Sequence, residues 1–365
     1  GSVGKPIITK IKCCIHDGFV YFPLIKDGGE FLYYVFAGGA PYGGLGKLGT
    51  QLNLNTDTVG NIVMGYPPPD EQAAIVRFLD AADRRIRRYI RAKQKLIKLL
   101  NEQKQAIIQR AVTRGLDTNV PMKDSGIEWL GEIPAHWESK RAKYYFREVD
   151  IRSTTGQEEL LSVSHITGVT PRSQKNVTMF KSASYVGSKI CQSGDLVINT
   201  MWAWMGAMGV SLQTGIVSPS YGVYRPKNGS DFLPGYLDSL LRTKPYVSEY
   251  VCRSTGIRSS RLRLYPEEFL RIPIVKPSTE EQQAVLSFLK SETSGIDGNI
   301  DHTNREIGLI REYRTRLIAD VVTGKVDVRG VAFELPEDFD EDNLLDVDED
   351  EAFEDEEIEE VSDAE

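Results

Sequence analysis

Arginine and hydroxyl side chains crowd into one segment, residues 253–264 (RSTGIRSSRLRL), and together they suit recognition of a nucleic acid. A guanidinium fork pairs with O6 and N7 of guanine or clamps a phosphate, and serine and threonine hydroxyls reach base edges or backbone. Leu262 and Leu264 alternate with Arg261 and Arg263, which predicts a half-buried strand with a charged outer face. Composition alone favours an ordinary solvated strand face, by about two to one. The candidate DNA contacts in this segment are Arg253, Thr255, Arg258, Ser259, Ser260, Arg261 and Arg263.

Two further places carry candidate DNA contacts. Asn199, Trp202 and Trp204 stand close together, and their indoles could stack on or wedge DNA, although packing in a core or rim explains them equally well. Lys47 is the single base of a glycine-rich loop with a literal Gly-x-Gly-x-x-Gly pattern, residues 44–49. No helical period follows this pattern, so we expect a flexible loop and not a dinucleotide site. The neighbouring residues also do not complete a phosphate-binding Walker motif.

Catalytic and metal-binding patterns are missing from the sequence. We find no nucleophile paired with a base, no nuclease-like cluster of carboxylates and no Asn/Asp-Pro-Pro-aromatic motif of adenine methyltransferases. The spacings of the four cysteines and four histidines match no metal site and no disulfide framework, so we expect reduced thiols. The sequence therefore predicts a non-catalytic protein without a cofactor or metal of its own.

An internal repeat organises the chain. Shifting the sequence by 210 positions superimposes two long segments, and 14 of the 47 positions from Glu71 to Asp117 are identical in the two copies. Each copy begins after a proline-containing stop, carries acids in its first turn and ends at a glycine, Gly115 or Gly324, which are the signals of a long helix with caps at both ends. A repeat with a whole domain between its copies indicates that the chain consists of two similar halves, each containing one of the long helices.

Both repeated segments carry apolar residues in a 4,3 spacing, which predicts a seam where the two helices pack together. The seam is interrupted by polar residues at equivalent places, Lys93/Thr303 and Lys104/Arg314, and such residues fix register and partner choice. About 44 residues would make a rod of roughly 65 Å. The apolar seam residues are Ile86, Ile90, Ile97, Leu100 and Ile107 in the first helix, and Ile296, Ile300, Ile307, Ile310 and Leu317 in the second.

The net charge of −8 hides two oppositely charged parts. The last 29 residues, 337–365, carry 18 acids and no base, which leaves 44 bases against 34 acids, a net +10, in the rest. The body therefore suits a polyanionic partner, and the tail is an expected disordered segment for which solubilisation is the simpler explanation. At 365 residues we expect at least two domains, and without a long apolar run or signal peptide we expect a soluble, cytoplasmic protein.

The motifs PPPDEQ and PSTEEQ before the helices, with GIEWLGEIPAHW at residues 126–137, resemble the specificity subunits of type I restriction-modification systems. The resemblance implies an α+β fold with two target-recognition domains and two long helices in an antiparallel coiled coil. The corresponding ranges are 1–69 (partial first recognition domain), 70–116 (first helix), 117–277 (second recognition domain), 278–326 (second helix) and 327–365 (linker and acidic tail). The first domain matches only the second half of the other: residues 19–23 fall on 222–226 and residues 52–54 on 262–264.

The resemblance also implies a function in host defence. Each recognition domain would bind half of a split site in double-stranded DNA, and DNA adenine methyltransferase subunits and a restriction/translocase subunit would dock on the chain. S-adenosylmethionine, ATP and Mg would then belong to the partner subunits. The resemblance also strengthens the assignment of Arg258 and Arg261 as DNA contacts, and to a lesser degree that of Arg263. The alternative is a non-catalytic coiled-coil adaptor that binds DNA nonspecifically.

Overall fold

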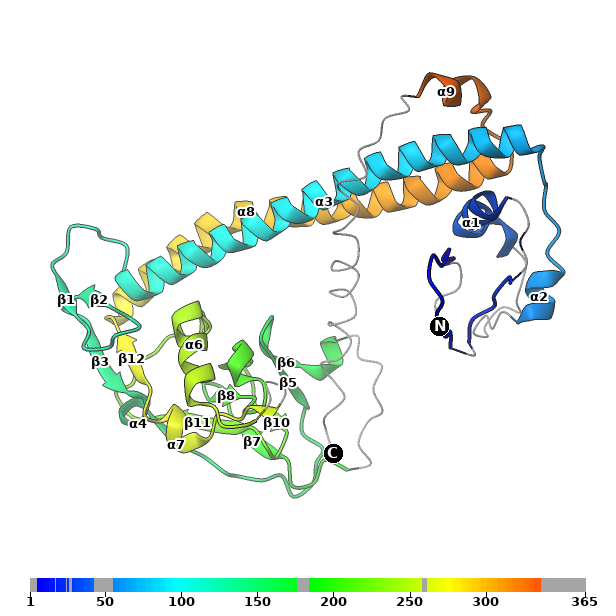
Figure 1. Cartoon of the computed structure of the whole chain (residues 1–365). Coiled ribbons are helices and arrows are strands. Elements are labelled where there is room, and N and C mark those ends of the chain that lie inside the picture. Colours follow the sequence, from blue (N-terminus) through cyan, green and yellow to red (C-terminus); the bar gives the residue numbers. More distant parts are fainter. Residues whose placement is uncertain are drawn as a thin grey trace. The chain divides into compact units, whose positions relative to one another are not determined.

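Two long helices dominate the chain, α3 (Pro69–Arg114, 46 residues) and α8 (Thr279–Val322, 44 residues) (Figure 1). Ser278 caps α8 reciprocally with Glu281: the Glu281 amide donates to Ser278 Oγ and the Ser278 amide to Glu281 Oε2, each over 3.2 Å. The helices are followed by Gly115 and Gly324, whose φ angles of 74° and 73° are left-handed and favour glycine. The predicted long helices and their glycine ends are confirmed.

The computed structural model describes residues 5–16, 18–23, 25, 28–42, 55–175, 184–257 and 261–335. These residues form two compact units, and the division between them cuts both long helices. Unit 1 holds the residues up to Lys98 and from Asn299 onward, and unit 2 holds Leu99–Gly298. Lys47, Arg258, Ser259, Ser260 and the acidic tail lie outside the described residues.

The two helices pair antiparallel in each unit. In unit 1, Asp83 pairs with Arg314, and Lys93 Nζ lies 2.9 Å from Glu306 Oε2. In unit 2, Lys104 Nζ lies 2.5 Å from Asp297 Oδ1. Position numbers rise along one helix as they fall along the other, which confirms the predicted antiparallel pairing.

Side chains along the seam are shielded from solvent. All ten apolar seam residues of the two helices are buried or half-buried. Three of the four polar seam residues have an acidic partner on the opposite helix, whereas the Thr303 hydroxyl donates to the Asn299 carbonyl of its own helix over 2.7 Å. Because each ion pair is possible in one register only, these pairs help to align the helices.

A four-stranded antiparallel sheet lies at the centre of unit 2. Its order is β4 (Phe146–Glu148), β11 (Gly222–Pro226), β8 (Leu196–Ile198) and β9 (Met208–Val210), with Val223 of β11 opposite Val197 of β8. Four two-stranded antiparallel sheets accompany it: β1 (Met122–Asp124) with β2 (Glu132–Pro134), β3 (Glu138–Arg141) with β12 (Pro273–Lys276), β5 (Leu161–Ser164) with β6 (Gly168–Pro171), and β7 (Lys189–Cys191) with β10 (Gly215–Val217).

Helices complete unit 2: α4 (Ala142–Tyr145), α5 (Pro234–Leu241), α6 (Lys244–Arg253) and α7 (Pro266–Phe269), with 3-10 turns η2 (Arg172–Gln174) and η3 (Ala203–Met205). Tyr236, Tyr246 and Tyr250 of α5 and α6 are fully buried in the core. The Tyr236 hydroxyl donates to the Val112 carbonyl near the end of α3 over 2.8 Å, so α5 is fastened to the long helix. These buried aromatic side chains contribute large apolar surfaces to a core that also contains many aliphatic residues.

Unit 1 also contains four short elements: α1 (Gly29–Ala37), the 3-10 turn η1 (Ala40–Tyr42), α2 (Thr56–Gly60) and α9 (Arg329–Glu334). Its core joins Phe31 and Val35 of α1 to Leu79 of α3 and Val321 of α8. Residues 19–23, which align in sequence with β11, form no strand. In unit 2, β11 pairs with β4 and β8, whereas no described strand of unit 1 flanks residues 19–23, and Phe19 and Tyr21 remain exposed.

The repeated Glu-Gln pair has a structural explanation. Gln282 Nε2 donates to the Pro277 carbonyl over 3.2 Å, and Gln282 Oε1 accepts the amide of Leu233, just before α5, over 2.8 Å. In unit 1, Gln72 Nε2 donates to the Pro67 carbonyl over 2.8 Å, and a Cβ on Gly28, just before α1, would lie 2.4 Å from Gln72 Oε1. Each glutamine therefore joins the start of a long helix to the start of a short one.

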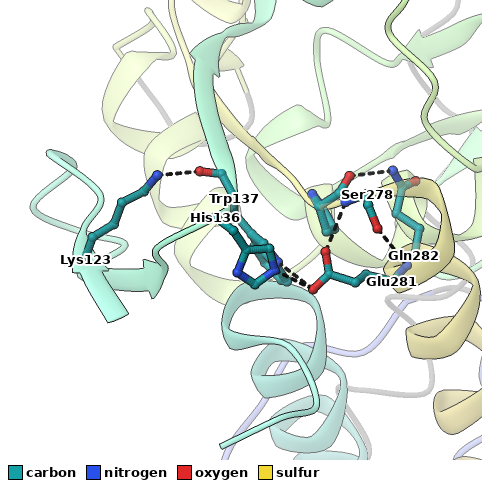
Figure 2. A network of polar contacts seen from close by, with 7 residues as sticks. Lys123, His136, Trp137, Ser278, Glu281 and Gln282 are labelled. Atoms are coloured by element: carbon teal, nitrogen blue, oxygen red, sulfur yellow. Dashed lines mark hydrogen bonds and ion pairs between the residues drawn. The ribbon is translucent and has the colours of Figure 1, made fainter. Parts of the chain in front are cut away.

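Trp137 closes the junction between α3 and α8 in unit 2 (Figure 2). It is 1% exposed, its indole nitrogen donates to Glu281 Oε1 over 3.2 Å, and His136 Nε2 lies 2.7 Å from the same oxygen. Burial alone would raise the pKa of Glu281, but hydrogen bonds from His136 and Trp137 hold that pKa below its usual range. Trp129 packs edge-on against Tyr246 at a ring-centroid distance of 4.9 Å. Both tryptophans thus anchor the segment that enters the domain.

Candidate nucleic-acid interface

Residues 253–257 and residues 261–264 are joined by backbone hydrogen bonds. The Thr255 amide donates to the Arg263 carbonyl over 3.0 Å, and the Arg263 amide donates to Thr255 over 2.9 Å. Gly256 allows the close approach of the two sides, because a Cβ there would lie 2.5 Å from the Arg261 carbonyl oxygen. The sequence predicted a strand here, but the described residues of this segment form one isolated bridge, between Thr255 and Arg263.

On its Leu264 side, this segment is anchored to the residues that follow strand β8. The Leu264 amide donates to the Thr200 carbonyl over 3.0 Å, and the Leu264 side chain is 1% exposed. Leu262 is half-buried, whereas Arg261 and Arg263 are exposed, so the predicted alternation of faces is present. No described side chain forms an ion pair with either guanidinium, and both arginines present their charge to solvent.

Arg253 is placed differently from the other arginines. Its Nε donates to Glu249 Oε1 over 2.5 Å, and its Nη1 lies 3.3 Å from Glu268 Oε2. The guanidinium therefore ties the end of α6 to α7, and a contact with DNA would compete with two carboxylates. An arginine four residues after a glutamate in a helix was the sequence signal for this ion pair.

Asn199 and Thr200 follow strand β8 and shape the turn beneath the loop. Asn199 is 6% exposed; its Oδ1 accepts the Met201 amide over 3.2 Å, and its Nδ2 donates to the Tyr221 hydroxyl over 3.0 Å. The Thr200 hydroxyl donates to the Ser220 carbonyl over 2.9 Å. Both side chains form hydrogen bonds within the domain. Their geometry therefore fits a role in supporting residues 261–264 better than contact with bases.

Trp202 and Trp204 stack on each other, with ring centroids 6.1 Å apart and an interplanar angle of 17°. The Trp204 indole nitrogen donates to the Met201 carbonyl over 2.9 Å, and both rings are half-buried beside η3, which packs against α6. Insertion of either ring between base pairs would require the stack to open.

A basic stretch on α3 was overlooked among the candidate residues. Between residues 84 and 98 the helix carries eight bases and no acid, and most of these side chains are exposed: Arg84, Arg85, Arg87, Arg88, Lys95 and Lys98. Arg87 pairs with Asp83 and Lys93 with Glu306, so part of the charge is already balanced. The signal was present in the sequence as a block of like charge. It makes this face of unit 1 a second surface suited to phosphates.

Solved structures show where this fold occurs. A chain of the structure described as the basis of complex assembly and conformational transition of the type I R-M system matches with a TM-score of 0.56 and 15% identity, covering 81% of this chain and 71% of its own. The HsdS subunit from Thermoanaerobacter tengcongensis matches at 0.39 and 16%, covering 80% and 68%, and the type I S subunit from M. genitalium at 0.36 and 13%, covering 80% and 72%. The first exceeds a TM-score of 0.5, and at its low identity it shows a shared fold. No protein-family model and no curated protein sequence matches the chain.

The described residues hold no group of three or more His, Cys, Asp or Glu side chains able to bind a metal ion. No helix among them has both the length and the apolarity needed to cross a bilayer.

Proposed function

We propose that the chain is the DNA-recognition (specificity) subunit of a type I restriction-modification complex. The observation that carries the proposal is the fold, which is shared across 81% of the chain with a structure of the type I R-M system. The motif resemblance to specificity subunits points the same way. In this role the chain performs no chemistry: it binds double-stranded DNA and positions methyltransferase and restriction/translocase subunits, which would carry S-adenosylmethionine, ATP and Mg.

Arg261 and Arg263 are the best-placed DNA contacts of unit 2. Both stand exposed on a loop that is fixed by the Thr255 bridge and by the buried Leu264, so little ordering is needed when they bind. A guanidinium without a competing carboxylate can pair with a guanine or a phosphate, unlike that of Arg253. Arg258, Ser259 and Ser260 lie outside the described residues and remain expected contacts.

The basic stretch on α3 supports nonspecific attraction to the phosphate backbone. Arginines 84, 85 and 88 supply exposed positive charge without adding sequence information. These two roles fit a subunit that recognises a split DNA site: one surface binds the phosphate backbone by charge, and exposed loops contact the bases. It would also serve a nonspecific adaptor, so the test must separate the two functions.

The test is selection of DNA from a random duplex library by the full chain with its methyltransferase partner. A split sequence motif is expected, and a flat sequence profile would favour the adaptor. If Arg261 contacts a guanine, Arg261→Ala should cost about 1 to 3 kcal/mol on the selected half-site and relax one base pair. A phosphate contact should instead weaken every sequence equally and make the salt slope shallower by about one unit.

Arg271→Ala provides a matched control, because Arg271 is an exposed arginine of the same unit that pairs with Glu268. It should leave the selected motif unchanged. Arg253→Ala should chiefly lower the stability of unit 2, since it leaves Glu249 and Glu268 without their shared cation. Unaltered motif and affinity in both Arg261→Ala and Arg263→Ala would place the base-reading surface elsewhere.

A further inference from the structure

Five bases of α3 lie on one face of the helix. They follow one another at intervals of seven, four, three and four residues, and at 3.6 residues per turn all five lie within about 40° of a common direction. The seam residues Ile86, Ile90 and Ile97 fall on the opposite face, so these bases point away from α8 and extend about 27 Å along the helix. We call them the basic stripe: Arg77, Arg84, Arg88, Arg91 and Lys95.

Much of the charge of the basic stripe is not balanced by described acids. From residue 84 to residue 98, α3 carries no acid. No carboxylate among the described residues forms an ion pair with Arg88, Arg91 or Lys95. Bases three or four positions apart on a helix are neighbours and repel each other. A negatively charged occupant would therefore bind the stripe and relieve this repulsion.

The acidic tail leaves the described part of the chain beside the basic stripe. Leu335 is the last described residue before the tail, and its carbonyl oxygen accepts a hydrogen bond from Nη2 of Arg77 over 2.5 Å. The next seven residues include five acids, at positions 337, 338, 340, 341 and 342. An extended chain advances about 3.3 Å per residue, so about eight residues after Leu335 are enough to follow the stripe from Arg77 to Lys95.

The tail is also the one undescribed segment of unit 1 whose charge matches the basic stripe. Residues 336–365 hold 18 acids and no base. The other undescribed residues of unit 1 hold two acids and two bases: Asp17, Asp27, Lys26 and Lys47. Because the tail is tethered at the stripe, its effective concentration there is on the order of 1 mM, which favours it over free anions of similar affinity.

We propose that residues 337–342 dock on the basic stripe of α3 and cover it. The contact joins acidic side chains to a row of bases at the helix surface, so it weakens as salt screens both partners. Docking of the tail stands on the contacts and charges of unit 1 alone. Its consequence for DNA rests on the proposed function: phosphates that bind the stripe must first displace the tail, so the tail weakens nonspecific DNA binding.

The first measurement follows the tail in the full chain, without DNA, by amide nuclear magnetic resonance. The signals of residues 337–342 should be broad at about 50 mM salt and sharp at about 500 mM salt, where screening is stronger. Three changes in the stripe should sharpen them at low salt: Arg84→Gln, Arg88→Gln and Lys95→Gln. The matched control is the same change at three exposed bases in the unit 1 part of α8, and it should leave the signals broad: Arg305, Arg311 and Arg316.

The second measurement is the affinity of the full chain for a duplex of random sequence at low salt. Replacing the five acids of residues 337–342 by their amides should raise this affinity by about tenfold or more. The matched control changes five acids farther along the same tail: Glu354, Asp355, Glu356, Glu357 and Glu359. It raises the net charge by the same five units and should stay within about threefold of the unchanged chain. In the glutamine variant of the stripe, the two tail variants should have equal affinity. Circular dichroism verifies that the stripe variant and its α8 control keep their helices.

Sharp tail signals at low salt in the unchanged chain, or equal effects of the two tail variants on DNA affinity, overturn the proposal. Sharpening by the α8 control to the same extent as by the stripe variant also overturns it, because the tail would then respond to net charge and not to the stripe. Broad tail signals that the stripe variant sharpens, in a chain that binds no duplex, support the docking and contradict the proposed function instead.

Discussion

The buried ion pair between the two long helices in unit 1 gives a quantitative test of how they are held in register. Asp83 is 4% exposed and accepts from Arg314 of α8 and from Arg87 of its own helix, whereas Arg314 is 28% exposed. Burial alone would lower the pKa of Arg314, but the hydrogen bond to Asp83 raises that pKa. Asp83→Leu leaves Arg314 half-buried without its partner and should cost about 3 kcal/mol, near the lower end for a broken buried pair.

Arg314→Leu should cost less, about 2 kcal/mol, because Asp83 keeps Arg87. The double variant places two leucines against each other among the apolar residues of the seam, so its total cost should also be about 2 kcal/mol, with only Arg87 left unpaired. The two changes are therefore non-additive by about 3 kcal/mol. A purely solvent-exposed pair would instead give a coupling below about 1 kcal/mol.

The distribution of tryptophans supplies the assay. All four belong to unit 2, so tryptophan fluorescence follows that unit, while far-ultraviolet circular dichroism also follows the helices of unit 1. In urea, Asp83→Leu should shift the midpoint seen by circular dichroism downward by about 1 to 3 M and leave the fluorescence midpoint in place. Additive single and double variants, or a single-variant cost under about 1 kcal/mol, would refute the role of this pair in the seam.

Three further outcomes are expected. Burial raises the pKa of Asp238 to about 6, only partly opposed by the hydrogen bond from the Val210 amide. The folded state therefore holds this proton more tightly than the unfolded state, and stability should fall by about 3 kcal/mol as pH rises from about 4 to about 6, a slope that urea titrations should show and Asp238→Asn should abolish. Gly115→Ala should lower the melting temperature more than Gly324→Ala: both strain a left-handed residue, but only the first adds a contact with an indole, worth about 1 kcal/mol. Deleting residues 337–365 changes the net charge from −8 to +10 and should strengthen nonspecific DNA binding at low salt; superimposable binding curves across a salt series would contradict this.

Local patterns made the helices predictable from sequence. The 4,3 spacing of Ile86, Ile90 and Ile97, the acids of the first turns and the glycines at the ends all act within a few residues, so they can be recognised without knowing the fold. The pairing of the two helices was also accessible, because two copies of one seam in a single chain have each other as partners, whereas its antiparallel direction came from the resemblance to specificity subunits. The polar seam residues pointed to cross-helix contacts, although their acidic partners Asp83, Asp297 and Glu306 were not identified.

Long-range relations were less accessible. Nothing local to Leu264 shows that its amide meets Thr200, 64 positions away in the chain, yet this contact decides which side of the arginine loop is fixed. The spacing of apolar residues also could not show that the boundary between the two compact units falls within both long helices, because that boundary depends on tertiary packing. For residues 19–23 sequence similarity to β11 was misleading, because a strand forms only where neighbouring strands satisfy its backbone groups.

Two residue pairs that are identical in both copies of the repeat, the glutamines and the glutamates, differ in the kind of group that their side chains contact. Gln72 and Gln282 bind backbone atoms, and backbone carbonyls and amides are present at a helix junction whatever domain is attached. Glu71 and Glu281 hold equivalent places but meet different partners, Arg329 in one unit and His136 with Trp137 in the other, because those partners come from the segment that follows the opposite helix. The glutamines thus make the same kind of backbone contact at both helix junctions. The glutamate carboxylates instead bind different side chains, which the following segment supplies in each unit.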